Sequence, residues 1–533
     1  MDILYITKAP AFACEENELR YSLRSIAQYG RGVGRVFVCG YCPDWLSEKV
    51  VRVPFRTHAN PEDVRAKNWD IAHKILYAVA QTDISEEFLV SMDDHFYCHD
   101  TDFSNYPAYV KAINNGQLPA SRGADNYNNF LYDCRQYLLE KGLPTLYFTL
   151  HRNMPLTRTA LRECSGLIEE AERRGCAVEL FTLVNNYRYA KGEIAPVYTA
   201  DCKIRGEKDF DARIKAEMGV FSTFDFWPFS GLAKRLAALF PNPCVYEREI
   251  ARKRAKRGKG VRVACVCMCK REENYIDEWL EHHFALGFDD IYILDNNDWG
   301  DEAMREKVDA WNNPHLHYID IRGKRHCQRE VYNRFYADYR EQYEWVAYLD
   351  ADEFLTFEDS TRNLKDMLTA KPFRDADEVR FCWKLYGDSD LLDVVDGDYS
   401  VKRFTRPIEH PETNPRGCIC KSIINTRFVG TIWIHGLYGE DIIALNSAGE
   451  PCNNRNNTIG DTPFYGPAWI NHYRCKTIGE FVRQKVRRGD ASEAQFEEQY
   501  DDLSQFFLDN PYNKEKANYA VALYAQLYPK KKK

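Results

Sequence analysis

Two pairs of acidic residues each follow a run of apolar residues, and they are the strongest candidates for chemistry in this chain of 533 residues. The first pair is Asp93 and Asp94, in FLVSMDDHFY, and the second is Asp350 and Asp352, in EWVAYLDADEFL. Residues i and i+2 of a strand point the same way, so Asp350 and Asp352 can converge on one cation. Mg²⁺ and Mn²⁺ favour carboxylate oxygens and bridge to substrate phosphates, which suits the departure of a nucleotide diphosphate. We therefore expect a Mn²⁺ or Mg²⁺ site at each pair; an exposed acidic turn is the alternative.

The segments around these pairs alternate between strand-like and helix-like patterns in both halves of the chain. The strands that we expect span residues 3–6, 35–39, 87–91, 261–268, 291–294, 317–321 and 345–349. The helices that we expect span residues 18–29, 68–80, 275–286 and 329–343. Such alternation predicts parallel βαβ units, in which ligands bind at the carboxyl ends of the strands. Both acidic pairs fall at such ends.

Length and composition bound the remaining possibilities. A chain of this size suggests two or three domains, and we expect an N-terminal domain at 1–245, a basic linker at 246–260, a second domain at 261–495 and a helical tail at 496–533. The 72 Lys and Arg against 80 Asp and Glu give a net charge of −8, which argues against a nucleic-acid-binding protein. We find neither a signal peptide nor an apolar run of spanning length, which predicts a cytoplasmic protein whose 18 cysteines are reduced.

Two basic segments predict contact with a membrane surface. The linker is dense in Arg and Lys, and the chain ends in Lys530 to Lys533 after an aromatic, helix-like pattern. Basic residues close to a membrane are attracted to anionic lipid headgroups. We therefore expect the protein at the inner face of the cell membrane. A solvated linker and a frayed, solubilising tail are the alternatives.

A series of short segments runs in order through the second half of the chain. They are Arg271-Glu272, Glu278-Trp279-Leu280, Gly287, Asp295-Asn296, Gln328, Tyr332-Asn333, WVAYLDADEFL, WKLYGDS, Lys421-Ser422-Ile423, His435, Asn471-His472-Tyr473, Lys476-Thr477, Lys485 and Gly489. In this order they resemble the bacterial glycosyltransferase-2-like family that is related to family 92 glycosyltransferases. The resemblance covers roughly residues 261–495. It implies a GT-A fold, a nucleotide-diphospho-sugar donor and a divalent metal.

The resemblance also implies roles for single residues. The donor-binding residues would be Arg271, Glu272, Asp295, Asn296, Gln328, Asn333, Lys421 and Arg474. Among these, Asp295 would hold uracil or ribose, and Lys421 and Arg474 would stabilise the leaving diphosphate. The metal ligands would be Asp350, Asp352 and His472, with His435 as the weaker candidate; a hydrogen-bonded wall residue is the alternative for either histidine. Asp388 and Asp390 are the candidates for the catalytic base that deprotonates the acceptor hydroxyl.

The N-terminal half carries ELRYSLRSI, from Glu18 to Ile26, and the segment FLVSMDDHFY. Both resemble blocks of the Stealth family, whose members transfer sugar-1-phosphates in capsule synthesis. His151 with Pro155, and the segment 239–247, stand where that family has two further blocks. The family's opening block is replaced by Tyr5-Ile-Thr-Lys-Ala, which favours ordinary glycosyl transfer on a Stealth-like fold.

This second resemblance implies a site in the N-terminal half as well. The donor would contact Arg20 and Arg24, which an amphipathic helix leaves outside its apolar face, and Lys67 and Asn68, which lie at the start of the next helix. The metal would be held by Asp93 and Asp94, and Asp94 is also a candidate catalytic residue. His95 is a further candidate ligand or a packed wall residue.

We therefore expect an α/β protein with two tandem GT-A-like domains, which are Rossmann-like with mixed sheets and bind nucleotide sugars, followed by a helical tail. It would be a bifunctional, metal-dependent glycosyltransferase that uses UDP-sugars such as UDP-galactose or UDP-galactofuranose. With a lipid-linked or oligosaccharide acceptor, it would build a bacterial surface polysaccharide such as an O-antigen or a capsule. One alternative is a single-site glycosyltransferase with an N-terminal acceptor-binding module. The other is a Stealth-type sugar-1-phosphate transferase fused to a glycosyltransferase.

Overall fold

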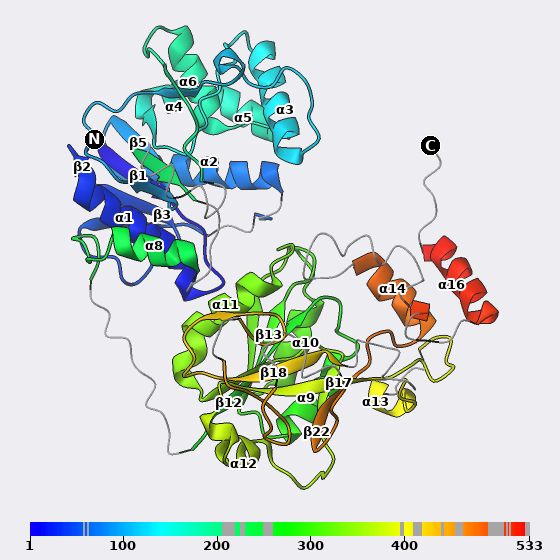
Figure 1. The fold of residues 1–533 in the computed structure, drawn as a ribbon. Coiled ribbons are helices and arrows are strands. Elements are labelled where there is room, and N and C mark those ends of the chain that lie inside the picture. The colour runs from blue at the N-terminus through cyan, green and yellow to red at the C-terminus, as the bar shows by residue number, and fades with distance from the viewer. Residues whose placement is uncertain are drawn as a thin grey trace. The chain divides into compact units, whose positions relative to one another are not determined.

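The computed structural model divides the chain into two compact units, residues 1–252 and 253–533, drawn in blue to green and in green to red in Figure 1. The residues that it describes are 1–56, 59–60, 63–204, 210, 219–223, 230–248, 260–394, 399–408, 418–438, 442–452, 462–488, 506–507, 510 and 513–527. The division falls inside the segment expected as a linker. Most of that segment, together with Gly489 and Lys530 to Lys533, lies outside the described residues.

A five-stranded sheet is the centre of the N-terminal unit. Its strands are β1 (Asp2–Ile6), β3 (Val36–Gly40), β4 (Val50–Pro54), β5 (Glu87–Met92) and β9 (Met154–Thr157). They lie in the order β4-β3-β1-β5-β9, and they are parallel except for β9, which runs antiparallel to β5. The helices are α1 (Asn17–Tyr29), α2 (Val64–Gln81), α3 (Asn126–Glu140), α4 (Arg158–Glu163), α5 (Ser165–Arg173), α6 (Leu180–Ala190) and α8 (Gly231–Leu239).

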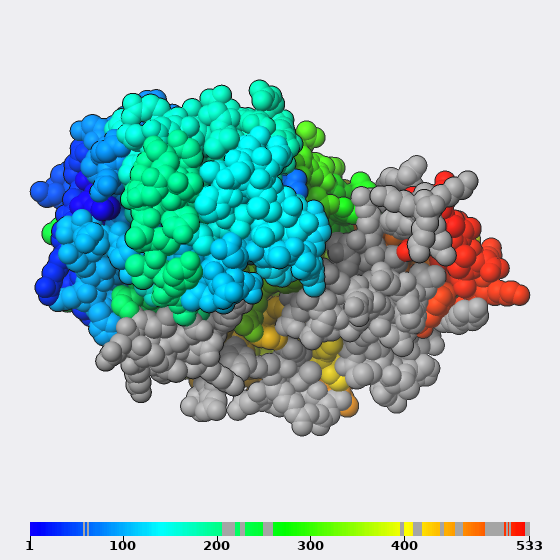
Figure 2. All heavy atoms as spheres, turned by 90° about the horizontal axis from the view of Figure 1, so that it is seen from above, coloured from blue at the N-terminus to red at the C-terminus, as the bar shows by residue number. Residues whose placement is uncertain are grey.

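Strand β1 shows how the sequence creates two apolar layers. Leu4 and Ile6 contribute to a core that includes residues of α2 and α3. The alternate residues Ile3 and Tyr5 contribute to a second core that includes α1. This alternation places helices on both faces of the sheet, as expected for strands buried on both sides. In Figure 2 the segment from α3 to α6, in cyan to blue-green, forms a continuous packed surface of this unit.

Three pairs of short strands accompany this sheet among the described residues, and one of them is β2 (Gly30–Arg31) with β7 (Thr101–Asp102). Strand β6 (His95–Tyr97) pairs antiparallel with β11 (Val220–Ser222). Strand β8 (Tyr109–Lys111) pairs parallel with β10 (Val197–Thr199). Asp93 and Asp94 form the turn that joins β5 to β6.

A nine-stranded mixed sheet is the centre of the C-terminal unit. Its strands are β12 (Val263–Cys269), β13 (Asp290–Asp295), β14 (Leu316–Asp320), β15 (Trp345–Tyr348), β16 (Glu353–Phe357), β17 (Glu378–Leu385), β18 (Cys420–Asn425), β21 (Ala444–Asn446) and β22 (Ala468–His472). Their order is β14-β13-β12-β15-β18-β17-β22-β16, and β21 also pairs with β17. The first four are parallel, β18 is antiparallel to both of its neighbours, and β16 is antiparallel to β22. The expected α/β class with a mixed sheet in each half is confirmed.

The helices of this unit are α9 (Ile276–Ala285), α10 (Ala303–Trp311), α11 (Gln328–Tyr339), α12 (Leu364–Thr369), α13 (Ser400–Arg403), α14 (Ile478–Arg488) and α16 (Lys514–Leu527). Near the end of the chain, Ala520 of α16 packs with Ile478 and Phe481 of α14. No helix in the described parts of the chain is both long enough and apolar enough to cross a membrane.

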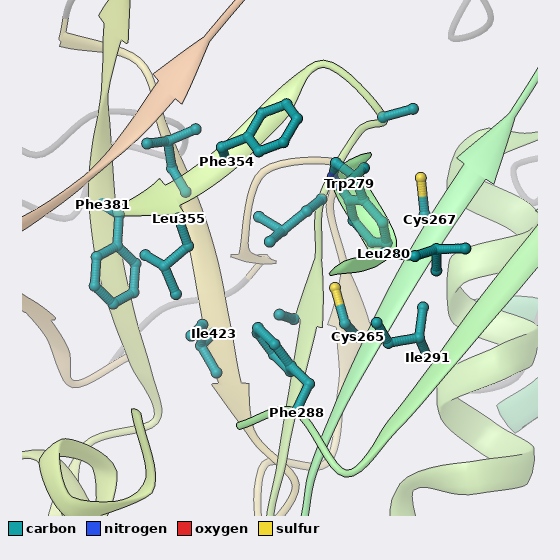
Figure 3. Close-up of a cluster of buried hydrophobic side chains, with 14 of the residues drawn as sticks. Cys265, Cys267, Trp279, Leu280, Phe288, Ile291, Phe354, Leu355, Phe381 and Ile423 are labelled. Carbon is teal, nitrogen blue, oxygen red and sulfur yellow. The ribbon is translucent and has the colours of Figure 1, made fainter. Parts of the chain in front are cut away.

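Packing between α9 and the sheet forms the core of the C-terminal unit (Figure 3). Trp279 and Leu280 lie beside Cys265 and Cys267 of β12 and Ile291 of β13, and all five side chains are fully buried. The indole Nε1 of Trp279 donates a hydrogen bond of 2.9 Å to the backbone oxygen of Glu353. This bond ties the core to the start of β16, directly beside the acidic segment.

All seven residues of β12 are buried, three of them cysteines. The sulfur atoms of Cys267 and Cys269 lie 3.5 Å apart. None of the 18 cysteines forms a disulfide. The thiols of β12 therefore act as small apolar side chains at the centre of the sheet.

Candidate functional site

The second acidic pair lies in a tight turn between β15 and β16. The backbone N–H of Glu353 donates to the backbone oxygen of Asp350 over 3.0 Å, and the N–H of Asp350 donates to Oε2 of Glu353 over 2.9 Å. The expectation that strand geometry aligns Asp350 with Asp352 is therefore wrong, because β15 ends at Tyr348 and the chain turns before β16 begins.

Asp350 is held by a buried cation. Its Oδ2 lies 2.9 Å from Nζ of Lys421, and its Oδ1 accepts a 3.3 Å hydrogen bond from Nε2 of Gln328. The same Lys421 nitrogen lies 3.4 Å from Glu353. The side chains of Lys421 and Glu353 are 1% and 0% exposed, whereas Asp350 is 34% exposed. Asp350 is thus the member of this cluster that solvent and ligands reach.

The positive charge of Lys421 is stabilised by its contacts with Asp350 and Glu353. Burial alone would lower the pKa of Lys421, but Asp350 and Glu353 raise it above its ordinary value, so Lys421 stays protonated. Burial raises the pKa of Glu353 well above its ordinary value, although Lys421 opposes this effect. A fixed ammonium beside Asp350 offsets the charge of that accessible carboxylate, which lowers the repulsion that a diphosphate would meet at this turn.

Asp352 and His472 form the second contact of the site. Oδ1 of Asp352 lies 3.4 Å from Nε2 of His472, and their side chains are 7% and 6% exposed. Antiparallel pairing of β16 with β22 sets this contact, because Glu353 and His472 are direct partners. The ring of Trp383 lies 4.4 Å from that of His472 and 5.3 Å from that of His435. In the sequence Trp383 stood out only as the first residue of WKLYGDS, and no local pattern indicated that its ring lies beside both histidines.

His435 has a different partner from the one we expected. Its Nδ1 donates a 3.1 Å hydrogen bond to the backbone oxygen of Cys420. Burial, and then the charge of Lys421, lowers the pKa of His435 to about 3, so its ring is neutral at physiological pH. The structure therefore supports a wall position for His435.

The fit of a divalent metal to this cluster depends on Asp352 and His472. In the described segments, no group of three or more His, Cys, Asp and Glu side chains is arranged to hold a metal ion. Mg²⁺ and Mn²⁺ often use only one or two protein ligands and fill the other positions with water and substrate phosphates. The Asp352–His472 pair fits such an open site, whereas Asp350 already binds Lys421.

The residues at the carboxyl ends of β12 and β13 mainly hold loops. Asp295 is fully buried and accepts hydrogen bonds from the N–H of Asn297 over 2.9 Å and from the hydroxyl of Tyr318 over 2.7 Å. Burial raises the pKa of Asp295 to about 6. The amide of Asn296 donates to the backbone oxygens of residues 321 and 324. Asp295 and Asn296 thus hold the loops that follow β13 and β14 in place through hydrogen bonds.

Four other predicted donor residues have defined surroundings. The backbone N–H of Arg271 donates to Asn297 over 2.7 Å, and its side chain pairs with Asp298. Glu272 lies 3.7 Å from Nζ of Lys476, which lies 4.0 Å from the ring of Tyr275. The predicted donor residue Asn333 exchanges two 2.8 Å hydrogen bonds with the backbone of Ile432, and Arg474 follows β22 within two residues of His472. Gln328 and Lys421 contact Asp350 directly, so they are the predicted donor residues that join the acidic cluster.

The predicted bases Asp388 and Asp390 contact the C-terminal helix. Nζ of Lys516 in α16 lies 2.6 Å from Oδ2 of Asp388 and 3.3 Å from Oδ1 of Asp390. Asp388 is 4% exposed, and its backbone N–H donates to Asn510 over 2.7 Å. Asp390 is 68% exposed and also pairs with Arg406; Lys516 and then Arg406 lower its pKa. Asp388 is therefore an anchor for the C-terminal helix, and only Asp390 is open to an acceptor.

The first acidic pair lies in a turn of the same kind, with different partners. Oδ2 of Asp94 accepts a 2.6 Å hydrogen bond from the hydroxyl of Ser222. Nδ1 of His95 lies 3.3 Å from Oδ1 of Asn153, and burial lowers the pKa of His95 to about 4. His95 is thus a neutral, buried wall residue at this turn.

Arg20 and Arg24, which we expected to meet a phosphate, have a carboxylate partner within the chain. Both bind Glu247, with Nε of Arg24 at 2.7 Å and Nη1 of Arg20 at 2.9 Å from its carboxylate. The guanidinium of Arg20 also lies 4.2 Å from the ring of Trp45. These arginines tie the end of the N-terminal unit to α1, a pairing that no local pattern in the sequence indicates.

The start of α2 does not offer the expected anion site either. The side chain of Asp63 caps this helix by accepting from the N–H groups of residues 65 and 66. Asn68 uses its side-chain amide to donate to the backbone oxygen of Val64 over 2.8 Å, and Lys67 is exposed. A negatively charged cap already occupies the position in which an anion would bind.

His151, which the sequence placed only by resemblance, forms a pair with Asp201. Its Nδ1 lies 2.9 Å from Oδ1 of Asp201, whose Oδ2 lies 3.0 Å from Nζ of Lys111. Asn153, two residues after His151, links this pair to His95 at the acidic turn. The N-terminal unit therefore gathers its own polar cluster at this edge.

Comparison with known proteins connects the chain to glycosyltransferases over part of its length. No family model matches the chain. A glycosyltransferase family 92 protein of Oryza sativa subsp. japonica is 30% identical over 112 residues, which are 20% of this chain and 18% of that protein. The chain thus matches less than a fifth of the length of this relative.

Three solved structures are also similar to the chain. The glycosyltransferase GlyE of Streptococcus pneumoniae TIGR4 has 9% identity and a TM-score of 0.24, over 63% of this chain and 83% of GlyE. The bifunctional glycosyltransferase WbbM has 8% identity and a TM-score of 0.27, over 80% of this chain and 79% of WbbM. S. aureus TarS 1–349 in complex with UDP has 16% identity and a TM-score of 0.18, over 26% of this chain and 37% of TarS.

Proposed function

We propose that the C-terminal unit transfers a sugar from a nucleotide-diphospho-sugar to a hydroxyl group of an acceptor. The observation that carries the proposal is the cluster at the turn between β15 and β16, where Lys421 and Gln328 hold the accessible Asp350 beside the Asp352–His472 pair. The partial match to a family 92 glycosyltransferase supports the reaction class.

In this proposal Lys421 stabilises the departing diphosphate. Its ammonium is fixed and buried, so little reorganisation is needed when negative charge grows on the leaving oxygen. Trp383 gives the site an apolar wall against which a sugar or base can pack. Asp352 and His472 would hold Mn²⁺ or Mg²⁺, which would supply further positive charge to the diphosphate.

Asp390 is the proposed base for the acceptor hydroxyl. It is the exposed member of the Asp388–Asp390 pair, and its neighbours Lys516 and Arg406 favour the ionised carboxylate that a base requires. The acceptor would then approach along the segment after β17.

The N-terminal unit is proposed as a second nucleotide-sugar site, which would make the chain bifunctional. Its acidic turn, between β5 and β6, repeats the strand–turn–strand arrangement of the C-terminal unit. Asp93 and Asp94 would hold the metal there, and the oriented ring of His151 lies at the same edge. An acceptor-binding module or a sugar-1-phosphate transferase is the alternative for this unit.

The biological setting that we propose is the assembly of a bacterial surface polysaccharide, an O-antigen or a capsule, at the inner face of the cell membrane. Two sites on one chain suit a polymer of alternating sugars, because the product of each site is the acceptor of the other. UDP-sugars, including UDP-galactose and UDP-galactofuranose, are the proposed donors, and a lipid-linked oligosaccharide is the proposed acceptor.

The test is a donor screen with the full-length protein, Mn²⁺ and a panel of UDP-sugars, with the released nucleotide as readout. We expect release of UDP. Asp350→Asn and Asp93→Asn should each remove a different product linkage. Loss of the same linkage in both variants would contradict two sites, and release of UMP would point to phosphate transfer in the N-terminal unit.

A further inference from the structure

The N-terminal unit contains a histidine whose ring is oriented by a carboxylate and is itself partly exposed. Nδ1 of His151 lies 2.9 Å from Oδ1 of Asp201, and the backbone N–H of His151 donates to the same oxygen over 3.3 Å. The other carboxylate oxygen, Oδ2, lies 3.0 Å from Nζ of Lys111. The side chain of His151 is 36% exposed, whereas those of Asp201 and Lys111 are each 17% exposed. Solvent and ligands therefore reach this cluster mainly at the imidazole.

The backbone of three short segments sets this arrangement. Parallel pairing of β10 with β8 places Thr199 opposite Lys111, and Asp201 follows two residues later. His151 precedes β9, and its backbone oxygen accepts a hydrogen bond of 2.7 Å from the thiol of Cys202. The histidine and its carboxylate are thus held next to each other by main-chain contacts as well as by their side chains.

The charge of Asp201 decides which nitrogen of the imidazole carries the hydrogen. Burial alone would raise the pKa of Asp201, but His151 and then Lys111 lower it well below its ordinary value, so this carboxyl is ionised. An ionised carboxylate only accepts hydrogen bonds, so Nδ1 of His151 is the donor. In the neutral ring Nε2 then carries the lone pair, and it has no hydrogen-bond partner among the residues that the structure describes. An imidazole in this state is equipped to accept a proton.

One connection leads from this cluster through β11 to the acidic turn between β5 and β6. The backbone N–H of Ser222 donates to the backbone oxygen of Cys202, the residue after Asp201, over 3.3 Å. The hydroxyl of Ser222 donates to Oδ2 of Asp94 over 2.6 Å. A single residue of β11 therefore joins the carboxylate that orients His151 to the carboxylate proposed to bind the metal.

A second connection runs through the residues that follow His151. Asn153 comes two residues later, and its Oδ1 lies 3.3 Å from Nδ1 of His95, the residue after Asp94. The first connection starts at the carboxylate of the pair and the second at the histidine. Together they place the exposed imidazole at the same edge as the acidic turn.

We infer that His151 is the catalytic base of the N-terminal unit, and that it acts on a hydroxyl group of a sugar acceptor. Nε2 takes the proton of this hydroxyl, and the acceptor oxygen forms a bond to the anomeric carbon of the donor sugar. The bond between that carbon and the diphosphate breaks, and its electron pair leaves with the diphosphate. Asp201 is a positioning residue, which fixes the tautomer of the ring and stabilises the imidazolium that forms.

This inference rests on the proposed function of the N-terminal unit and supplies the base for its site. The sequence offered Asp94 for that role. Asp94 accepts a hydrogen bond from Ser222 and is a proposed metal ligand, and a carboxylate beside a cation is a weak proton acceptor. With His151 as the base, the metal and the proton are handled by different side chains.

The test measures the linkages that the full-length protein forms with Mn²⁺, with UDP-galactose and UDP-galactofuranose as donors and with octyl galactoside as acceptor. The N-terminal linkage is the one that Asp93→Asn removes. His151→Ala should slow the formation of this linkage about a hundredfold or more, because the acceptor proton has no base. The KM for the donor and the rate of the C-terminal linkage should stay at their wild-type values.

Two substitutions of Asp201 separate positioning from a merely structural role. The amide of Asp201→Asn can donate to Nδ1 of His151, which moves the ring hydrogen to Nε2 and blocks proton transfer there. The kcat for the N-terminal linkage should therefore fall about a hundredfold with little change in KM. Asp201→Glu keeps an ionised acceptor and should retain more of the rate. If Asp201 only filled space, Asn, which has its size, would be the milder change.

His73 provides the matched control, because it belongs to the same unit and also contacts a carboxylate. Its Nε2 lies 2.7 Å from Oε1 of Glu172, and its side chain is 41% exposed. His73→Ala should leave both linkages unchanged. Formation of the N-terminal linkage by His151→Ala at the wild-type rate would overturn the inference. So would a wild-type rate for Asp201→Asn.

The same products distinguish failure of this inference from failure of the proposed function. If wild type forms both linkages and His151→Ala retains both, His151 is not the base and the second site stands. If wild type forms only the linkage that Asp350→Asn removes, the second site itself is refuted, and the assigned base with it.

Discussion

Each of the two acidic pairs lies in a turn between two strands, but Asp350 and Asp94 contact groups of different charge. In the C-terminal unit, Asp350 binds the protonated Lys421, a buried cation. In the N-terminal unit, Asp94 accepts a hydrogen bond from the neutral hydroxyl of Ser222 and lies 3.9 Å from the neutral ring of His95. A turn between two strands therefore places carboxylates at a sheet edge. The positive charge beside them comes from other strands, as Lys421 does from β18.

The largest effect that we expect comes from removing the cation from the C-terminal turn. Lys421→Met should lower UDP release by this unit about a thousandfold, because a fixed charge at the departing diphosphate is lost. Lys421→Arg, which keeps the charge, should retain more activity. Analysis of the glycosidic linkages in the product measures the activity of both units in one protein. The linkage formed by the N-terminal unit serves as the internal control. Equal loss of both linkages would contradict the difference between the two turns.

A second comparison concerns the C-terminal end of each unit. A cluster of ion pairs holds each end, and the central charge is negative in one cluster and positive in the other. Glu247 lies among two arginines, and Lys516 lies between two aspartates. Lys516→Met should cost about 3 kcal/mol of unfolding free energy, because Asp388 remains buried without its partner. The double variant with Asp388→Asn should recover most of that loss. Denaturant unfolding measures the free energy of unfolding of each variant. If Lys516→Met were as stable as wild type, the ion pair would contribute nothing to stability.

One buried group in each unit should contribute to stability with an opposite dependence on pH. Asp295 has a folded pKa of about 6, above its ordinary 3.8, so its buried charge destabilises the C-terminal unit as pH rises from 4 to 7. His95 has a folded pKa of about 4, below its ordinary 6.5, so the N-terminal unit loses stability as pH falls through that range.

Two variants isolate these contributions. In wild type, ionisation of Asp295 should cost roughly 3 kcal/mol of stability between pH 4 and 7, and Asp295→Asn should abolish this dependence. His95→Gln should abolish a loss of similar size that wild type shows as pH falls through the same range. Thermal unfolding across this pH range compares each variant with wild type. If the unfolding temperature of a variant depended on pH in the same way as that of wild type, the substituted residue would not be the group responsible.

The smallest effect concerns metal affinity. Asp352→Asn and His472→Gln should each weaken Mn²⁺ binding to the C-terminal unit about tenfold, as measured by calorimetry in the presence of UDP. His435→Gln is the matched control, since its Nδ1 binds a backbone oxygen. If His435→Gln lowered the affinity for Mn²⁺ as much as His472→Gln does, the assignment of His472 as the metal ligand would be contradicted.

The strands, the helices and the positions of the acidic pairs could be predicted, because they depend on local periodicity. Leu19, Leu23 and Ile26 face one core from α1, as their spacing indicates. The partners of the charged side chains could not be predicted in this way. Arg20 and Glu247 are 227 residues apart in the chain, so only the completed fold brings them together.

The same limit applies at the acidic turn. The residue types of the segment at Asp350 indicated a divalent metal, which stays a prediction. They did not indicate the ammonium of Lys421, 71 residues further on, which contacts Asp350. A pattern of carboxylates reveals that positive charge is needed without revealing its source. The antiparallel strands β18 and β22 supply Lys421 and His472, and their pairing depends on tertiary packing rather than on local sequence.

The buried thiols of β12 give the C-terminal unit a built-in reporter of its own opening. Cys265 and Cys267 lie at the centre of the sheet, and burial raises the pKa of both thiols well above the ordinary value. These two thiols pack against Trp279 and Leu280 of α9, so an alkylating reagent reaches them when this packing opens. The rate at which the two cysteines become modified therefore measures how often the core between α9 and the sheet opens.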